Sequence, residues 1–212
     1  MDRAELQERY SAEEYYWGTE PNDLAATAVE YVEATREAST ATGASDAPVA
    51  VDVGAGEGRD AVYLAEEGFR TYAVDPVPAG LEKAERLADE RGVEVETRRG
   101  DVNDLELPER VDLFYSIGTL QYLRPENREA QFRRFREATR EDRVHAVFAF
   151  VDHPEVATAP DWGDNEHFYA QGELRGYYDD WDILEEDAFV FDDDSNGEPH
   201  RHAAEVVVAR KP

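Results

Sequence analysis

The stretch Val51-Asp52-Val53-Gly54-Ala55-Gly56-Glu57-Gly58-Arg59 decides the fold of this chain. The β-branched run Val49–Val53 before the glycines predicts a buried strand, and residues Arg59–Glu67 after them predict a helix. Alternate glycines let the backbone turn tightly and let its N–H groups approach a ligand. The helix that follows offers its first amides to an anionic group. The turn therefore predicts a nucleotide-type ligand at the carboxyl ends of the strands, although glycine turns also occur for packing alone.

Short β-branched runs alternate with amphipathic segments along the rest of the chain. We expect N-terminal helices at about 2–16 and 22–37, then strands at 70–74, 93–98, 111–116 and 144–151 and helices at 79–91 and 127–139. This alternation predicts a parallel sheet covered by helices on both faces. The last two runs, 182–191 and 203–210, are joined by Asp194-Ser195-Asn196-Gly197, and Asn-Gly is a strong hairpin signal. The expected fold is one α/β domain over 1–212, with a mostly parallel seven-stranded sheet that ends in an antiparallel hairpin.

Composition limits the class of protein. Fifty acidic residues face twenty-two basic ones, which gives a net charge of −28 spread along the whole chain. This distribution is typical of the solvated surface of a halophilic protein, with a cationic partner as the alternative. The chain has no cysteine, which excludes disulfides, thiolate metal sites and a cysteine nucleophile. No apolar run approaches the roughly 18 residues that span a membrane, and no signal peptide is evident, so we expect a cytoplasmic protein.

A carboxylate follows each of the next two strands. Asp75 ends the second strand, before Pro76, where it could accept both hydrogen bonds from a ribose diol. Gly100-Asp101-Val102 follows the third strand, where an acidic residue suits the exocyclic amine of adenine. A nicotinamide dinucleotide is the alternative ligand, because G-x-G-x-x-A fits when counted from Gly56. Asp52 and the Gly-Asp pair argue against that alternative.

The series D-x-G-x-G-x-G at 52–58, Asp75 and Gly-Asp at 100–101 resembles the motifs of class I S-adenosylmethionine-dependent methyltransferases, over about residues 48–152. The final hairpin is also like that family. The resemblance implies a Rossmann-like methyltransferase fold and S-adenosyl-L-methionine as the cofactor. It places Ser116 near the sulfonium and Tyr122 in the methyl-transfer channel. The cofactor-binding residues that it implies are Trp17, Asp52, Gly54, Gly56, Gly58, Arg59, Asp75, Pro76, Asp101, Val102 and Ser116.

Two further stretches resemble narrower groups. Residues 15–22, Tyr-Tyr-Trp-Gly-Thr-Glu-Pro-Asn, are similar to the N-terminal segment that closes over the cofactor in small-molecule methyltransferases, which makes 1–47 a helical cap. Residues 167–181 resemble the tellurite-resistance methyltransferases, with their Phe-x-x-x-Gly-Glu-Leu-x-x-Tyr-Tyr-x-x-Trp. Basic residues of that family correspond to Phe191, Asp192 and about Pro199 here, so tellurite and selenite should bind poorly. Residues 153–212 are then the acceptor side, and 48–152 the cofactor-binding core.

A further set of residues is predicted for the acceptor side of the site. We expect catalytic roles for Tyr16, Tyr122, His167 and Arg175, with His153 as a further candidate and with Trp162 and Phe168 as a wall near the sulfonium. Asp152-His153 resembles a metal-ligand pair, but no other cluster completes a site, so no metal is expected.

The predicted function is methyl transfer to a small molecule, with a soft nucleophile such as a thiol or chalcogen compound favoured. No nucleic-acid or membrane partner is expected, and the oligomeric state is left open. The alternatives are methylation of a protein or nucleic acid, a non-catalytic cofactor-binding protein and a nicotinamide oxidoreductase.

Overall fold

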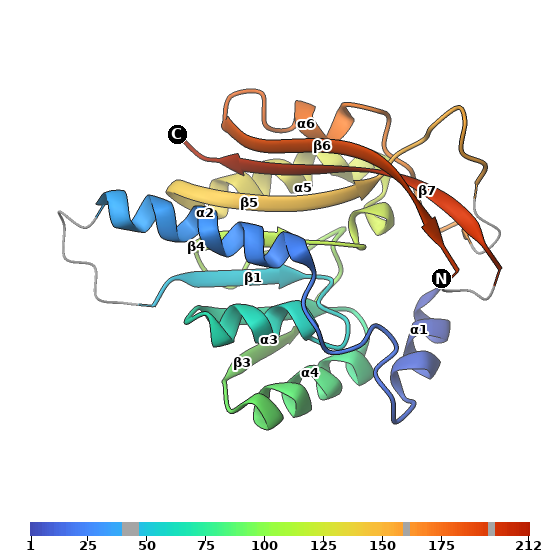
Figure 1. Ribbon diagram of the computed structural model, residues 1–212, viewed down its shortest axis with the longest axis horizontal. Coiled ribbons are helices and arrows are strands. Elements are labelled where there is room, and N and C mark those ends of the chain that lie inside the picture. Colours follow the sequence, from blue (N-terminus) through green and yellow to red (C-terminus); the bar gives the residue numbers. More distant parts are fainter. Residues whose placement is uncertain (40–46, 159–161, 195–197) are drawn as a thin grey trace.

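A computed structural model describes residues 1–39, 47–158, 162–194 and 198–212, and its centre is a twisted seven-stranded sheet (Figure 1). The strand order is β3-β2-β1-β4-β5-β7-β6. The first five strands pair in parallel, and β7 pairs antiparallel with both β5 and β6. The strands are β1 (Val49–Val53), β2 (Arg70–Asp75), β3 (Val95–Arg99), β4 (Val111–Ser116), β5 (Thr139–Phe150), β6 (Asp182–Asp193) and β7 (His200–Arg210).

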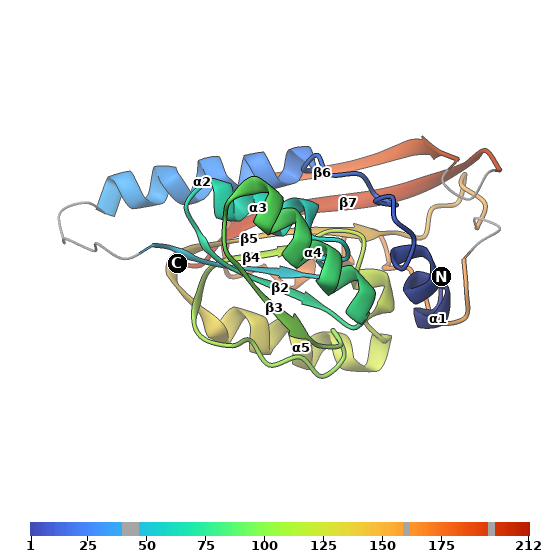
Figure 2. The ribbon, with the colours of Figure 1, turned by 90° about the horizontal axis from the view of Figure 1, so that it is seen from below.

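Helices cover both faces of this sheet (Figure 2). On one face lie α2, α3 and α4, and on the other lie α5 and α6; α1 stands at the end of the sheet toward which β1 and β4 point (Figures 1 and 2). The helices are α1 (Arg3–Tyr10), α2 (Asp23–Ser39), α3 (Arg59–Glu66), α4 (Pro78–Arg91), α5 (Pro125–Ala138) and α6 (Glu173–Gly176), with a 3-10 turn η2 (Leu120–Tyr122). The expected Rossmann-like fold, a mostly parallel seven-stranded sheet with an antiparallel end and helices on both faces, is confirmed.

The two helical layers bury two separate apolar clusters against the sheet. Every residue of β1 and β4 is buried, as expected for central parallel strands covered on both faces. On the α5 side, Phe114 stacks on Phe135 with ring centroids 4.6 Å apart. On the α2 side, Ala28 and Val32 are fully buried against the sheet, one turn of helix apart. The packed strands thus hold the loops at their carboxyl ends in fixed positions.

The N-terminal helix is shorter than predicted, ending at Tyr10 instead of about residue 16. Asp2 and Glu5 form a capping box that fixes its start. Beyond Tyr10 the chain leaves the helix and crosses the glycine turn, where the Trp17 N–H donates to the Glu57 carboxylate over 3.0 Å. A tertiary contact therefore overrides the local helical pattern.

The C-terminal hairpin is longer than predicted. β6 continues to Asp193, and β7 begins at His200 instead of residue 203. The expected Asn196-Gly197 turn lies outside the described residues. β5 also begins earlier than predicted, at Thr139. Within the described ranges, no helix is both long and apolar enough to cross a membrane.

Candidate functional site

A cavity of about 430 Å³ opens at the carboxyl ends of β1, β2 and β4. Its floor is the glycine turn, the end of β2 and residues 117–119 after β4. Its sides come from α1, the segment around Trp17 and the paired ends of β6 and β7. Ligands of doubly wound α/β folds bind at this position, in the crevice outside the carboxyl ends of the strands.

Gly54 and Gly56 line this cavity, and both have positive φ angles, +85° and +54°. A Cβ on Gly54 would overlap the Thr119 hydroxyl, so only glycine fits there. Gly58 also has a positive φ, but it is not among the cavity-lining residues, and a Cβ on it would overlap Ala84 of α4. The first two glycines therefore shape the cavity, while Gly58 lets α3 and α4 approach closely.

Asp75 holds the glycine turn to the end of β2. Its carboxylate accepts a hydrogen bond from the Gly56 N–H over 2.9 Å and from the Val77 N–H over 2.8 Å. The residue is 6% exposed and lines the cavity. Burial raises the pKa of Asp75 to about 6, against the lowering effect of these two N–H groups. Each carboxylate oxygen keeps lone-pair capacity, so Asp75 can accept hydroxyl donors from a ligand.

A second acidic group lies at the base of the cavity. Burial, together with the carboxylates of Asp60 and Asp75, raises the pKa of Asp52 well above its usual range. Asp60 accepts two hydrogen bonds from Asn22, each 2.6 Å long, and one from the Tyr115 hydroxyl over 3.2 Å. The raised pKa means that Asp52 is protonated more easily than an ordinary aspartate, so its carboxyl group can donate as well as accept a hydrogen bond at the cavity.

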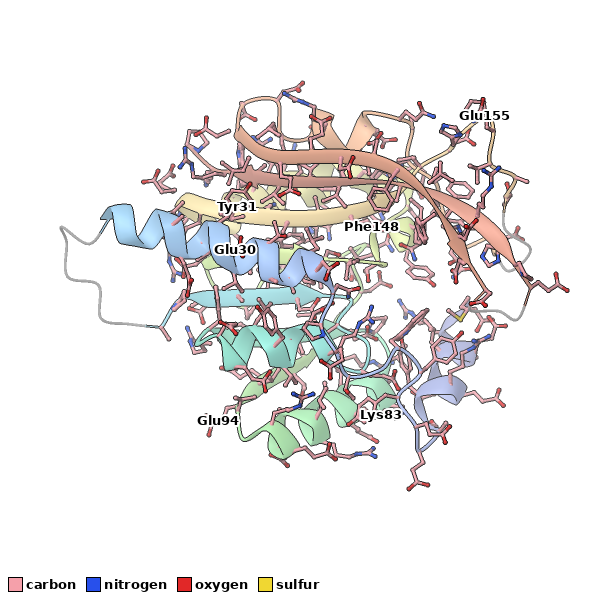
Figure 3. The ribbon with its side chains drawn as sticks, in the orientation of Figure 1. Glu30, Tyr31, Lys83, Glu94, Phe148 and Glu155 are labelled. Carbon is pink, nitrogen blue, oxygen red and sulfur yellow. The ribbon has the colours of Figure 1, made fainter. Side chains whose placement is uncertain are left out.

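The N-terminal segment lies over the glycine turn through specific polar contacts. Arg59 donates to the Trp17 carbonyl and to the Asn22 side chain over 2.9 and 3.0 Å. The Trp17 indole N–H donates to the Tyr10 hydroxyl over 3.0 Å. Beneath them, Lys83 of α4 forms a buried ion pair with Glu57 over 2.6 Å and reaches the N-terminal segment (Figure 3). Arg59 and Trp17, both predicted cofactor residues, thus lie at the cavity.

Aromatic rings form the opposite end of the cavity. Phe148 and Phe150 come from β5, Phe191 from β6, and Trp162 from the preceding loop (Figure 3 labels Phe148). Phe150 contacts Trp162 edge-on at 5.1 Å between centroids and lies 4.9 Å from the ring of His202. Trp162 in turn stacks on the predicted wall residue Phe168 at 4.2 Å. We call Phe148, Phe150, Trp162, Phe189 and Phe191 the aromatic wall.

Several predicted cofactor residues lie away from the cavity lining. Asp101 accepts hydrogen bonds from Arg3 of α1 and from the backbone and side chain of Asn103. Val102 is buried, and its carbonyl accepts from Gln131 over 2.7 Å. The Ser116 hydroxyl donates to the Val53 carbonyl over 2.9 Å, which ties β4 to β1. Pro76, in contrast, lines the cavity beside Asp75.

Of the four predicted catalytic residues, Tyr122 lines the cavity. Burial and the neighbouring Glu166 carboxylate raise the pKa of its hydroxyl, which keeps it protonated.

The other three predicted catalytic residues make contacts elsewhere. The Tyr16 ring lies under the Arg9 guanidinium, 4.7 Å from the ring centroid, and Arg175 pairs with Asp179 over 2.7 Å on the exposed side of α6. His167 donates its backbone N–H to the Gln121 carbonyl over 2.7 Å. These last three residues are not among those lining the cavity. His153 lies apart as well, accepting from the Glu155 N–H over 3.2 Å.

Other cavity residues were missed by the sequence analysis. Tyr10, Thr119 and Gln121 come from segments without a motif, and His202 comes from a strand whose start was predicted too late. The side-chain oxygen of Gln121 is buried and has no hydrogen-bond partner among the described residues. A buried acceptor without a partner at a cavity indicates a place for a ligand donor.

Comparisons with known proteins agree with this geometry. The family described as "Methyltransferase domain" matches residues 50–142. The chain is 22% identical over 164 residues to the probable S-adenosyl-L-methionine-dependent methyltransferase TehB of Haemophilus influenzae, a match that covers 76% of this chain and 56% of TehB. Residues 50–142 thus have the sequence pattern of a methyltransferase domain.

Solved methyltransferase structures share the fold of this chain. The crystal structure of TehB from Haemophilus influenzae superposes with a TM-score of 0.71 at 21% identity, covering 85% of this chain and 62% of TehB. Magnesium protoporphyrin IX methyltransferase (ChlM) from Synechocystis PCC 6803 with bound SAH superposes at 0.64 and 14% identity, covering 99% of this chain and 94% of ChlM. The chain spans little more than half the length of the curated relatives it matches.

Proposed function

We propose that this methyltransferase transfers the methyl group of S-adenosylmethionine to a small-molecule acceptor with a soft nucleophile, a thiol above all. The observation that carries the proposal is the continuity of one cavity. It joins Gly54, Gly56 and Asp75 at one end to the aromatic wall at the other. A cofactor held at the first end would therefore present its reactive group to an acceptor held at the second.

The lining residues fit this cofactor. Gly54 and Gly56 leave room for close approach of the methionine and ribose portions, and Asp75 can accept both ribose hydroxyls. The unpartnered Gln121 oxygen can accept a further N–H or O–H donor. The carboxyl groups of Asp52 and Asp60 also line the cavity, where they can accept hydrogen bonds from a molecule that carries both an ammonium and a sulfonium group. Arg59 and Trp17 hold the N-terminal segment over it.

The residues of this chain would act by position and by exclusion of water. S-adenosylmethionine supplies a methyl group on a sulfonium sulfur, which leaves as a neutral thioether. The aromatic wall removes water from the acceptor and tolerates a nearby positive charge. Tyr122 is protonated, because its pKa is raised, and it can donate a hydrogen bond but cannot serve as a base. An acceptor that ionises readily suits such a site, since a hydroxyl or amine would need a base.

The lining of the acceptor end favours an acceptor with an apolar body over a small oxyanion. Phe191 occupies the strand position that faces the cavity, and Phe150 and Trp162 lie across from it. No arginine or lysine is found among the described residues that line this end. Tellurite and selenite, which need cationic donors, are therefore expected to be poor acceptors.

A product-detected acceptor screen in molar salt tests the proposal. The panel contains aliphatic and aromatic thiols, amines, halides, tellurite and selenite, with product detected by mass spectrometry. We expect thiols to be methylated fastest. Cofactor binding without turnover of any acceptor class would instead identify a non-catalytic binding protein, and rapid methylation of tellurite would contradict the proposed acceptor class.

Neighbouring positions on β6 provide a matched pair of variants for the wall. Phe191→Ala removes a ring from the cavity and should raise the KM for a thiol by about tenfold or more, the value of one buried aromatic side chain. Val190→Ala alters the next residue on the exposed face of the strand and should leave the KM unchanged. Equal effects of both substitutions would show that the wall does not bind the acceptor.

A further inference from the structure

Two histidines and an aspartate converge on one face of the β6–β7 hairpin. The antiparallel register pairs Asp193 with His200 and Phe191 with His202. Directly paired residues and residues two apart on a strand share a face of the sheet, so Asp193, His200 and His202 lie together. Arg201 and Asp192 pair on the opposite face, where Arg201 donates to the Glu155 carbonyl over 3.0 Å.

The donor atoms of these three residues are close enough to share one ion. The two histidine Nε2 atoms lie 2.9 Å apart, and the Asp193 Oδ2 atom lies 3.4 Å from His202 Nε2 and 3.7 Å from His200 Nε2. All three donor atoms fall within 4.8 Å of one another. Ligand atoms about 2.1 Å from a metal ion at the tetrahedral angle are separated by about 3.4 Å. The three separations between the donor atoms, 2.9, 3.4 and 3.7 Å, lie on both sides of this expected distance.

The surroundings of His200 set the tautomer that a metal ligand needs. Its Nδ1 atom lies 2.7 Å from the Glu198 carbonyl oxygen, which can only accept, so we assign the ring proton to Nδ1. The lone pair of Nε2 then points at His202 and Asp193. A ring N–H bound to a backbone carbonyl is the usual outer support of a metal-bound histidine. Both rings are also well buried, with side chains 7% and 6% exposed.

The cluster lies at the acceptor end of the cavity. Asp193 and His202 line the same cavity as Gly54 and Asp75, and the His202 ring contacts Phe150 and Phe191. A three-ligand site that borders a cavity keeps an open position for a further ligand, as catalytic zinc sites do.

We propose that Asp193, His200 and His202 bind a divalent transition-metal ion such as Zn²⁺, which holds the acceptor as a thiolate at its open position. The metal site itself is inferred from the geometry of the hairpin alone. Its role in holding the acceptor thiolate rests on the proposed function. A thiol that coordinates the ion releases its proton to solvent. The sulfur then forms the new bond to the methyl carbon while the carbon–sulfonium bond breaks, and that electron pair stays on the departing thioether.

Metal titration of untagged, chelator-treated protein in molar KCl tests the site directly. With CoCl₂ we expect one ion per chain and a visible absorption band of a low-coordinate Co²⁺ complex, which ZnCl₂ should abolish by competition. His200→Ala and His202→Ala should each weaken binding by about 100-fold or more. The His202→Cys substitution keeps a ligand and should add a sulfur-to-Co²⁺ charge-transfer band, a gain of signal that loss of folding cannot imitate.

His153→Ala and Asp192→Asn are the matched controls, because they remove a histidine and an acid outside the cluster. Both should keep one tightly bound ion. If wild-type protein binds no stoichiometric ion, or if the His200→Ala and His202→Ala proteins bind it as tightly as wild type, the site does not exist and the histidine pair is a hydrogen bond only.

A thiol added to the Co²⁺ protein without cofactor tests the second half. Thiophenol should shift the visible spectrum, and chelation should abolish thiol methylation while affinity for S-adenosylhomocysteine stays within twofold. Thiol methylation that survives chelation would overturn the role of the ion but leave the proposed function intact. A Co²⁺ site with no turnover of any acceptor would contradict the proposed function and leave the metal site standing.

Discussion

Two features of the Asp75 environment have opposite effects on the pKa of its carboxyl group. Its burial disfavours the ionised carboxylate, while its contacts with the N–H groups of Gly56 and Val77 need that charged form. The two backbone donors offset part of the cost of burying the charge, and the pKa still rises to about 6. The residue therefore fixes the glycine turn before any ligand arrives, so a bound ribose would find its acceptor in place.

Asp75→Ala should weaken binding of S-adenosylhomocysteine by about 1–3 kcal/mol, because the ribose hydroxyls would lose their acceptor. Calorimetric titration in molar salt measures this effect. Asp75→Asn keeps one acceptor oxygen and should lose less affinity. Unchanged affinity in the alanine variant would contradict the assignment of Asp75 to the ribose.

The sequence located the residues of the cavity that belong to the glycine turn and to the end of β2, because a local motif specifies both backbone and side chain there. Asp101 and Ser116, which were also predicted as cofactor residues, contact Arg3 and Val53 and are not among the residues that line the cavity. The sequence left open which of His200, Arg201 and His202 face inward, because the predicted strand began at residue 203; in the structure β7 begins at His200 and His202 lines the cavity. Contacts between segments that are distant in the sequence depend on the register in which the strands pair. A local sequence motif does not specify that register.

At the scale of elements, the strand–helix alternation predicted a mostly parallel sheet, and the Asn-Gly signal predicted its antiparallel end; the strand order β3-β2-β1-β4-β5-β7-β6 comes from the structure. The boundaries that moved are those governed by tertiary contacts. The N-terminal helix was predicted to extend to residue 16. In the structure the residues after Tyr10 instead form a segment that crosses the glycine turn, where Trp17 bonds to Glu57 and Arg59. The short α6 was not predicted, since four residues carry too little periodicity.

The close packing of α3 against α4 depends on Gly58, which is also the last glycine of the 52–58 motif. A Cβ on Gly58 would overlap Ala84, and its φ of +91° disfavours other residues. Gly58→Ala should lower the free energy of unfolding by about 2–4 kcal/mol, the sum of overpacking and backbone strain. Gly92→Ala is the matched control, with a φ of +72° but no atom within 4 Å of the new Cβ. Urea denaturation should show the larger loss for Gly58→Ala, and equal losses would exclude the packing role.

A buried polar network ties β5 to the segment after α6. His145 lies 2.7 Å from the Thr139 hydroxyl and 2.9 Å from the Tyr178 hydroxyl. Burial lowers the pKa of His145 well below 6.5, and the cations of Arg136 and Lys211 act in the same direction. The folded protein therefore keeps this ring neutral while the unfolded chain protonates it below about pH 6.5. Stability is lost as the pH falls through that value, by up to about 1.4 kcal/mol per pH unit for one proton.

His145→Gln should remove this component of the pH dependence, whatever its effect on absolute stability. The comparison must be made as a difference between variants, because Asp75, with its pKa raised to about 6, contributes a stability change of opposite sign between about pH 4 and 6. Urea midpoints from pH 5 to 8 give the difference. Parallel curves for the two proteins would show that His145 is protonated equally in both states.

The molecule as a whole carries an excess of negative charge that ion pairs cannot neutralise. Fifty acidic residues cannot all pair with twenty-two basic ones, and exposed acids such as Glu30 and Glu94 lie on separate helices and loops around the molecule (Figure 3). The resulting self-repulsion is a property of the compact state, since unfolding moves the charges apart. It acts over the Debye length, which shrinks from about 30 Å at 0.01 M salt to about 3 Å at 1 M.

The fold should therefore lose structure at low ionic strength and gain stability as salt is added. We expect the urea midpoint to rise steeply up to a few tenths molar KCl and then flatten, because screening is nearly complete once the Debye length falls below the spacing of the charges. A rise that continues linearly to several molar would indicate exclusion of salt from the surface instead. Glu94→Gln changes the charge by one unit out of 28 and should leave the curve nearly unchanged. A midpoint that does not depend on salt would show that this surface does not destabilise the folded state.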